Sequence, residues 1–292
     1  MSFSQQLSER YPVQIKVADR IYELGRALLV EDPRAPTEAV IRYLTASTLR
    51  SHTASMTLIM NGFGADAIKV VRSIFEVLVS LRYLIARPNE IENFVYFDDV
   101  VRWQRLEIYK RVQPKMYQTI PAKDIEARKA AFERARDRFL DAAGRLRSTW
   151  HGSNIAEMAR AVDLLDVYEV FYRYASSLHH SDPMGLSMLV DENSFNIETE
   201  PSFRHAGIAL TMTNSLALEG LSAYARVRAM PSSSEEPHEY AELRELIYSE
   251  PPTDEGGPGS FSAALSGGKR NEKCPVPVEA VIDSTDHRQN GD

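Results

Sequence analysis

Residues 170–183, VFYRYASSLHHSDP, contain the side chains of this chain that are best suited to chemistry. Arg173 precedes His180 by seven residues, and Ser176 and Ser177 lie between them. Seven helical residues turn through about 700°, so Arg173 and His180 would point within about 20° of each other. One helix face would therefore carry a permanent cation, a group that exchanges protons near neutral pH and two hydroxyls.

These groups suffice in principle to cleave RNA without a metal ion. Arg173 could hold the scissile phosphate through two parallel hydrogen bonds and stabilise the charge that builds on it. His180 could take the proton of the ribose 2′-hydroxyl or protonate the leaving oxygen. Because each chain offers one such histidine on this face, a second chain would supply the other half of the acid–base pair. We therefore expect a homodimer.

Two other interpretations of the same segment stay open. The face can be the solvated side of an amphipathic helix, on which Glu169 and Arg173 pair four residues apart and the helix dipole favours a histidine in the last turn. A metal site built from His179, His180 and Asp182 with Glu76 is disfavoured, because adjacent residues on a helix point about 100° apart. The sequence also has no ligand pair spaced as in His-Glu-x-x-His.

A helix expected over about residues 65–85 would form the core of the fold. Its apolar residues wrap more than half of its circumference: Ile68, Val71, Ile74, Phe75, Leu78, Leu81 and Ile85. Arg72 and Glu76 lie on this mostly buried helix and need partners. They could pair with each other at the bundle surface. Alternatively, Glu76 could orient Arg173 or His180 on a facing helix.

Residues 1–230 read as almost continuous helix broken by short turns, which predicts an all-α, up-and-down helical bundle. We expect an N-terminal helix within 1–36 and a bundle domain over 37–230. Thr37, Asn89 and Asp166 are predicted to cap helices. A basic helix should follow Pro121 and run to about residue 147, with a narrow apolar seam spaced seven apart, namely Ile125, Phe132, Phe139 and Leu146. A last long helix should span about 203–228.

Residues 231–292 differ sharply in composition from the rest of the chain. They hold 7 of the 15 prolines, 6 of the 14 glycines and 13 Asp/Glu against 5 Lys/Arg. This composition predicts an acidic, disordered tail that could recruit a protein partner. Within it, Tyr240, Leu243 and Ile247 would share one helix face, which could dock on this domain or on a partner, or form only transiently.

The sequence shows no secretory leader and no apolar run long enough to span a membrane. A lone cysteine, Cys274, excludes an internal disulfide. We therefore expect a cytoplasmic protein without membrane contact.

An arginine and a histidine closing a helix in an all-α bundle resemble the HEPN superfamily (higher eukaryotes and prokaryotes nucleotide-binding domain). Many of its members are metal-independent ribonucleases of toxin–antitoxin, abortive-infection and CRISPR-associated systems. Their motif is an arginine, four to six residues and a histidine near a dimer interface. The resemblance implies Arg173 and His180 as catalytic residues, and His179 also fits the spacing. Tyr174 departs from the polar residue that usually follows the arginine, which keeps a non-catalytic relative as an alternative.

Residues 40–225 also resemble a bacterial family of helical proteins with no assigned function. The resemblance lies in an Arg-Ser-x-x-Glu on the core helix, a Trp-x-Gly before a short helix and a Tyr-Arg…Ser…His segment, here Arg72, Ser73, Glu76, Trp150, Gly152, Tyr172, Arg173, Ser177 and His180. If the chain is a ribonuclease, we expect a supporting set around the catalytic pair, made of Arg72, Glu76, Tyr172, Ser176, Ser177 and His179.

The sequence thus predicts a metal-independent, HEPN-like ribonuclease that acts as a homodimer on RNA in phage defence or growth arrest. It predicts no cofactor and no metal. The alternative is a non-catalytic helical binding or scaffold protein, in which the polar face only ties helices together.

Overall fold

The computed structural model describes residues 1–187, 189–190, 199–229 and 238–249. These residues form helices and no β-sheet, as predicted, with one isolated bridge between Leu140 and Leu146. No helix in this part of the chain is long and apolar enough to cross a membrane. The main helices are α1 Phe3–Arg10, α2 Pro12–Val30, α3 Pro36–Met60, α4 Gly64–Ala86, α5 Ile91–Val112, α6 Pro114–Tyr117, α7 Ala122–Ala135, α8 Ile155–Arg160, α9 Leu165–Val167, α10 Arg173–His180, α11 Pro183–Ser187, α12 Ala206–Arg228 and α13 His238–Ser249.

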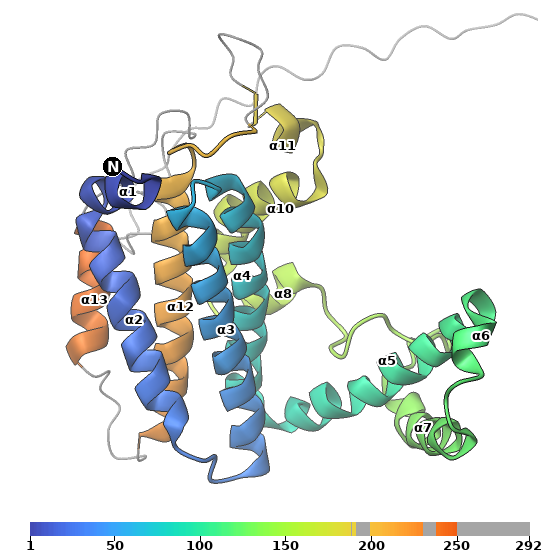
Figure 1. Ribbon diagram of the computed structural model, residues 1–292. Helices are drawn as coiled ribbons and strands as arrows, with labels where there is room; N and C mark the ends of the chain where they lie inside the picture. The colour runs from blue at the N-terminus through green and yellow to red at the C-terminus, as the bar shows by residue number, and fades with distance from the viewer. Residues whose placement is uncertain (188, 191–198, 230–237, 250–292) are drawn as a thin grey trace, which may run out of the picture.

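The long helices α2, α3, α4 and α12 form the bundle, and α10 packs on α4 (Figure 1). The predicted core helix is confirmed, because most of the apolar face of α4 is fully buried. α12 is buried even more completely, over residues 206–218 without interruption. Its small residues allow close approach: a Cβ added to Gly220 would lie 3.2 Å from the Thr48 side chain on α3. α2 packs on α12 and α3 and so is part of this bundle.

Three predicted helix limits differ from the structure. α3 begins at Pro36 after Ala35, so Thr37 lies inside the helix. Asn89 lies in a short 3-10 turn, Pro88–Glu90, that precedes α5. The basic helix ends at Ala135 and passes into a 3-10 turn, Arg136–Phe139. The chain then turns sharply at Gly144 (φ 74°), where the Asp141 carboxylate accepts the backbone N–H groups of residues 143 and 145.

Helices α5, α6 and α7 project from the bundle as an arm (Figure 1). The arm has a small apolar centre in which Phe97 meets Phe139 with ring centroids 5.1 Å apart and Trp103 stacks on Phe132 at 5.8 Å. Part of the predicted seam is therefore used, with Phe139 fully buried. Much of the α7 surface is solvated, as its alternating charges indicate.

Residues 238–249 correct the prediction of a disordered tail that starts at 231. They form α13, which packs on α2 and α12 and buries Tyr240, Leu243 and Ile247. The side chain of Gln14 on α2 donates a hydrogen bond to the backbone oxygen of Ile247 at 2.7 Å. The sequence-based alternative of docking on this same domain is thus the one observed. The remaining tail residues, 230–237 and 250–292, lie outside the described part of the chain.

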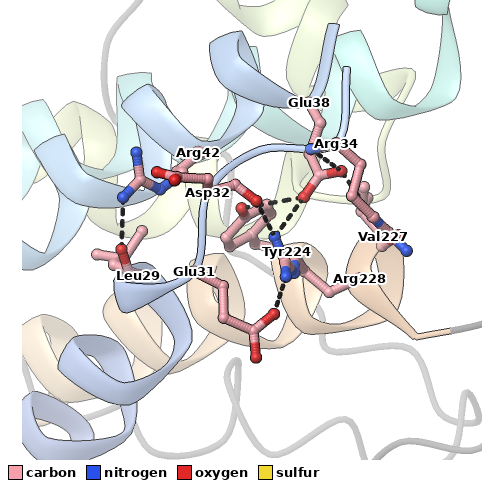
Figure 2. Close-up of polar contacts among 9 residues, drawn as sticks. All are labelled: Leu29, Glu31, Asp32, Arg34, Glu38, Arg42, Tyr224, Val227 and Arg228. Carbon is pink, nitrogen blue, oxygen red and sulfur yellow. Dashed lines mark hydrogen bonds and ion pairs between the residues drawn. The ribbon is translucent and has the colours of Figure 1, made fainter. Parts of the chain in front are cut away.

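A buried carboxylate locks the start of α3 to the end of α12 (Figure 2). Glu38, with a side-chain exposure of 7%, accepts hydrogen bonds from Arg34 at 2.9 Å and from Arg228 at 2.8 Å. Tyr224 also donates to it at 3.3 Å, and Arg228 reaches on to Glu31. Burial raises the pKa of Glu38, but the hydrogen bonds from the two arginines outweigh it and hold the pKa below its usual range.

Candidate functional site

The helix that carries the candidate site is continuous from Leu165 to His180 but changes type along its length. It begins after Leu164, so Asp166 lies inside the helix rather than capping it. Residues 168–172 form a π-helical turn, and α10 follows in regular α geometry. One side of this helix faces the core, with Phe171, Tyr174 and Leu178 buried and Val167 partly buried. Single π turns inside α-helices occur often at functional sites.

Arg72 and Glu76 on α4 meet this helix through Tyr172 and Ser176. Arg72 Nη2 and Glu76 Oε1 are 3.0 Å apart, which confirms the predicted ion pair. Arg72 also donates to Ser176 Oγ at 3.0 Å and to Tyr172 Oη at 2.9 Å. Tyr172 in turn donates to Glu76 Oε1 at 2.7 Å. Four of the predicted supporting residues therefore form one closed network between α4 and the candidate helix.

The network is half-buried, and its charges are compensated. The Arg72 side chain is 15% exposed and its guanidinium lies 4.9 Å from the Tyr172 ring centroid, in a cation–π contact. Burial raises the pKa of Tyr172, and the hydrogen bond to Glu76 raises it further. The phenol of Tyr172 therefore stays protonated and donates its hydrogen bond to the Glu76 carboxylate. This geometry fixes the rotation of the candidate helix against α4.

Arg173 and His180 lie on the solvent side of α10. The Arg173 side chain is 69% exposed and pairs with Glu169 at 2.9 Å, as the amphipathic interpretation predicted. This hydrogen bond raises the pKa of Arg173. His180 is exposed beside His179, with ring centroids 5.0 Å apart. Since α10 is a regular helix from residue 173, the predicted alignment of Arg173 and His180 along one face holds.

Glu76 does not orient the predicted catalytic pair. It bonds Tyr172, which precedes Arg173 by one residue and therefore points about 100° away from it. The sequence placed Glu76 opposite the correct helix but could not give the rotational register. Glu76 thus holds the helix in place, while Arg173 and His180 point to solvent.

The chain turns back on itself immediately after His180. Ser181 is left-handed (φ 52°), and the Asp182 carboxylate accepts the backbone N–H of Gly185 at 2.8 Å, a bond that lowers the pKa of Asp182. A Cβ added to Gly185 would lie 2.1 Å from the Ser177 carbonyl oxygen, so only glycine lets α11 approach α10 this closely. Asp182 thus caps α11, and no group of three or more His, Cys, Asp or Glu in the described residues could hold a metal ion.

Two contacts of this region had no clear signal in the sequence. Tyr174, which stands where a polar residue was expected, is buried, and its hydroxyl lies 3.0 Å from His205 Nδ1 just before α12. Trp150 packs edge-on against Tyr83 and Phe94, with ring centroids 5.9 and 5.3 Å away. The first contact joins α10 to α12. The second gives a structural role to the expected Trp-x-Gly.

The comparisons with known proteins identify a family but no characterised relative. A family model described as "Family of unknown function (DUF5677)" matches residues 38–197, more than half of the chain. No curated protein and no solved structure matches the chain. The expectation of a helical family without an assigned function is confirmed, whereas the HEPN relationship stays a prediction. The matched range contains Arg72, Glu76 and the whole of α10, and the chain belongs to this DUF5677 family.

Proposed function

We propose that this protein is a metal-independent ribonuclease in which Arg173 and His180 are the catalytic residues. One observation carries the proposal. Both side chains are exposed along one face of a helix whose rotation the Arg72–Glu76–Tyr172–Ser176 network fixes. A cation and a proton-exchanging group held on a rigid helix are prepositioned for a substrate, which favours catalysis over a merely solvated surface.

The reaction that this face supports is transfer of the phosphate within the RNA strand. The neutral imidazole of one His180 removes the 2′-hydroxyl proton, and the 2′-oxygen attacks the adjacent phosphorus. The bond to the 5′-oxygen breaks, and a protonated imidazole supplies the proton that this leaving group needs. Arg173 would exchange its surface pair with Glu169 for the phosphate and stabilise the charge on the phosphate oxygens. The products are a 2′,3′-cyclic phosphate and a 5′-hydroxyl.

This mechanism needs a second imidazole, which we propose comes from a second copy of the chain. His179 lies next to His180 but points about 100° away around the helix. One chain therefore does not place two imidazoles on opposite sides of the same phosphate. Met184 and Leu186 on α11 are 53% and 52% exposed and directly follow the candidate face. A second copy of the chain could cover these two apolar side chains while it brings its own α10 to the site. The active form would therefore be a homodimer in which two α10 faces oppose each other.

A second candidate function is a non-catalytic helical binding protein. The observation that favours it is the closed network itself, because Arg72, Tyr172 and Ser176 satisfy one another and tie α4 to the candidate helix without a substrate. In addition, a pocket between α2 and α3 lies away from Arg173 and His180, so a bound molecule there would not meet these two residues. In this case the exposed Arg173 and His180 would have no role in bond cleavage.

A cleavage assay with matched histidine variants separates the two functions. Wild type, His180→Ala, Arg173→Ala and His179→Ala are incubated with mixed RNA in excess EDTA, after circular dichroism shows equal helicity. We expect cleavage by the wild type, a loss of at least about a hundredfold in His180→Ala and Arg173→Ala, and near-normal cleavage by His179→Ala. Equal activity of all four proteins would show that the cleavage comes from a contaminating nuclease. RNA binding without cleavage would favour the binding function.

A further inference from the structure

A pocket of about 460 Å³ lies between α2 and α3 and is separate from the proposed ribonuclease face. Its volume is within the range of small-molecule sites. The side chains of Ile15, Met56 and Met60 give it an apolar lining, while Asp19 and His52 bring a carboxylate and an imidazole. The two methionines are flexible and can adjust to an occupant.

His52 has a defined proton arrangement. It is 2% exposed, and its Nε2 lies 3.1 Å from Asn214 Oδ1. The Asn214 amide nitrogen donates to the backbone oxygen of Gln14 at 2.9 Å and to its Oε1 at 3.1 Å. These two donations fix the amide with its oxygen toward His52. Because a carboxamide oxygen only accepts, His52 Nε2 must carry the hydrogen and donate it.

The other ring nitrogen of His52 is left as an acceptor without a partner. Burial lowers the pKa of His52 to about 4, so the ring is neutral at physiological pH and Nδ1 carries a lone pair. This Nδ1 atom is buried and has no hydrogen-bond partner among the described residues. The neutral ring therefore adds no positive charge to the pocket wall, so it does not repel a cationic occupant.

Most of the remaining polar groups of the lining accept hydrogen bonds, and the hydroxyls of Ser4 and Tyr22 can both accept and donate. The hydroxyls of Thr53 and Thr57 already donate to backbone oxygens one turn earlier, at 3.1 and 2.9 Å. Asn61 donates its amide to the Thr57 carbonyl at 2.8 Å, which leaves its side-chain oxygen as an acceptor. Asp19 is exposed at the pocket, and the lining contains no lysine or arginine. The pocket therefore combines one negative charge, several acceptors and an apolar wall.

We propose that this pocket binds a small organic cation, namely a protonated amine on an apolar or aromatic body. The ammonium group supplies the charge that complements Asp19 and the donors that the Asn61 and threonine side-chain oxygens lack. The apolar body packs against Ile15, Met56 and Met60. A carboxylate ligand would face the like charge of Asp19 and would bring no donor. The site is independent of the proposed ribonuclease function.

Calorimetric titration of the full chain with three matched probes tests this proposal. 2-Phenylethylamine is the cation, 2-phenylethanol its neutral counterpart and phenylacetate the anion. We expect saturable 1:1 binding of the amine, weaker binding of the alcohol and none of phenylacetate. Asp19→Asn should lower the affinity for the amine at least about tenfold and leave the affinity for the alcohol unchanged, since the substitution removes one charge–charge interaction. Asp137→Asn, an exposed aspartate outside the pocket, is the matched control and should bind the amine as the wild type does.

A nitrogen resonance of His52 provides the second readout. Addition of the amine should shift the ¹⁵N signals of the His52 ring, because this ring lines the occupied pocket, while phenylacetate should leave them in place. The proposal is overturned if the amine does not bind saturably, if phenylacetate binds equally well, or if Asp19→Asn has no effect. The His180→Ala variant should bind the amine normally, so failure of the ribonuclease proposal would leave this result untouched.

Discussion

The hydroxyl of Tyr172 accepts a hydrogen bond from Arg72 at 2.9 Å and donates one to Glu76 at 2.7 Å. This one phenol thereby links the Arg72–Glu76 ion pair of α4 to the helix that carries Arg173 and His180. The contact sets the rotation of that helix, and with it which side chains face solvent.

Removing this hydroxyl should loosen the two helices. Tyr172→Phe deletes both hydrogen bonds and keeps the ring, so we expect a loss of about 1–3 kcal/mol in the free energy of unfolding. Urea denaturation measures it. Tyr168→Phe is the matched control, because the Tyr168 ring stacks on Tyr172 at 5.0 Å but its hydroxyl makes no hydrogen bond within the described residues. Equal midpoints for the two variants would show that the network does not stabilise the fold.

The ion pairs of Glu38 should make the free energy of unfolding depend on pH in the acid range. Its pKa is lower in the folded state than in the unfolded state, so its contribution is present above the unfolded pKa and is lost as pH falls through the folded pKa. Glu38→Gln should cost about 3 kcal/mol at pH 7, because it leaves the arginines of a buried pair poorly compensated. The difference from the wild type should shrink on acidification. A difference that is constant with pH would refute the charged state assigned to Glu38. Glu133→Gln, at an exposed position, serves as the control.

Docking of α13 predicts different costs for two neighbouring residues. Ile247 is fully buried against α2 and α12, whereas Leu246 is 44% exposed. Ile247→Ala should reduce the free energy of unfolding by about 2–4 kcal/mol, while Leu246→Ala should change it by less than about 1 kcal/mol. Thermal and urea unfolding of both variants measure this contrast. Similar effects of both substitutions would mean that α13 does not pack as described.

If the active site needs residues from two chains, one inactive chain should abolish the activity of the dimer that contains it. If each site needs His180 from both chains, dimers that mix wild type with His180→Ala are inactive. After joint refolding at several ratios, RNA cleavage should fall with the square of the wild-type fraction. A linear fall would show that one chain carries the complete acid–base machinery.

Periodicity in the sequence predicted which face of α4 is buried, because the position of each apolar residue around a helix follows from its spacing. It also aligned Arg173 with His180. It could not show that Glu76 meets Tyr172, since contacts between helices depend on register and rotation that a single helix does not encode. The burial of α12 was also missed, because its alanines, serines and threonines carry little hydrophobic signal although they pack closely.

The lock at Glu38 and the docking of α13 have the same explanation. Glu38 and Arg228 are 190 residues apart in sequence, and a charged residue in a first helical turn looks like an ordinary surface residue. The apolar face of α13 was visible, but its partner lay on α2, whose own pattern named no specific neighbour. Long-range partners of polar residues were therefore the least predictable part of both the fold and the candidate site.

The most direct test of the ribonuclease proposal is the chemical identity of the RNA ends. Wild type and His180→Ala are incubated with a defined RNA in excess EDTA, and the products are analysed by mass spectrometry. We predict 2′,3′-cyclic phosphate and 5′-hydroxyl ends from the wild type and intact RNA from the folded variant. Intact RNA in both samples, or the same ends in both, would contradict a catalytic role for His180.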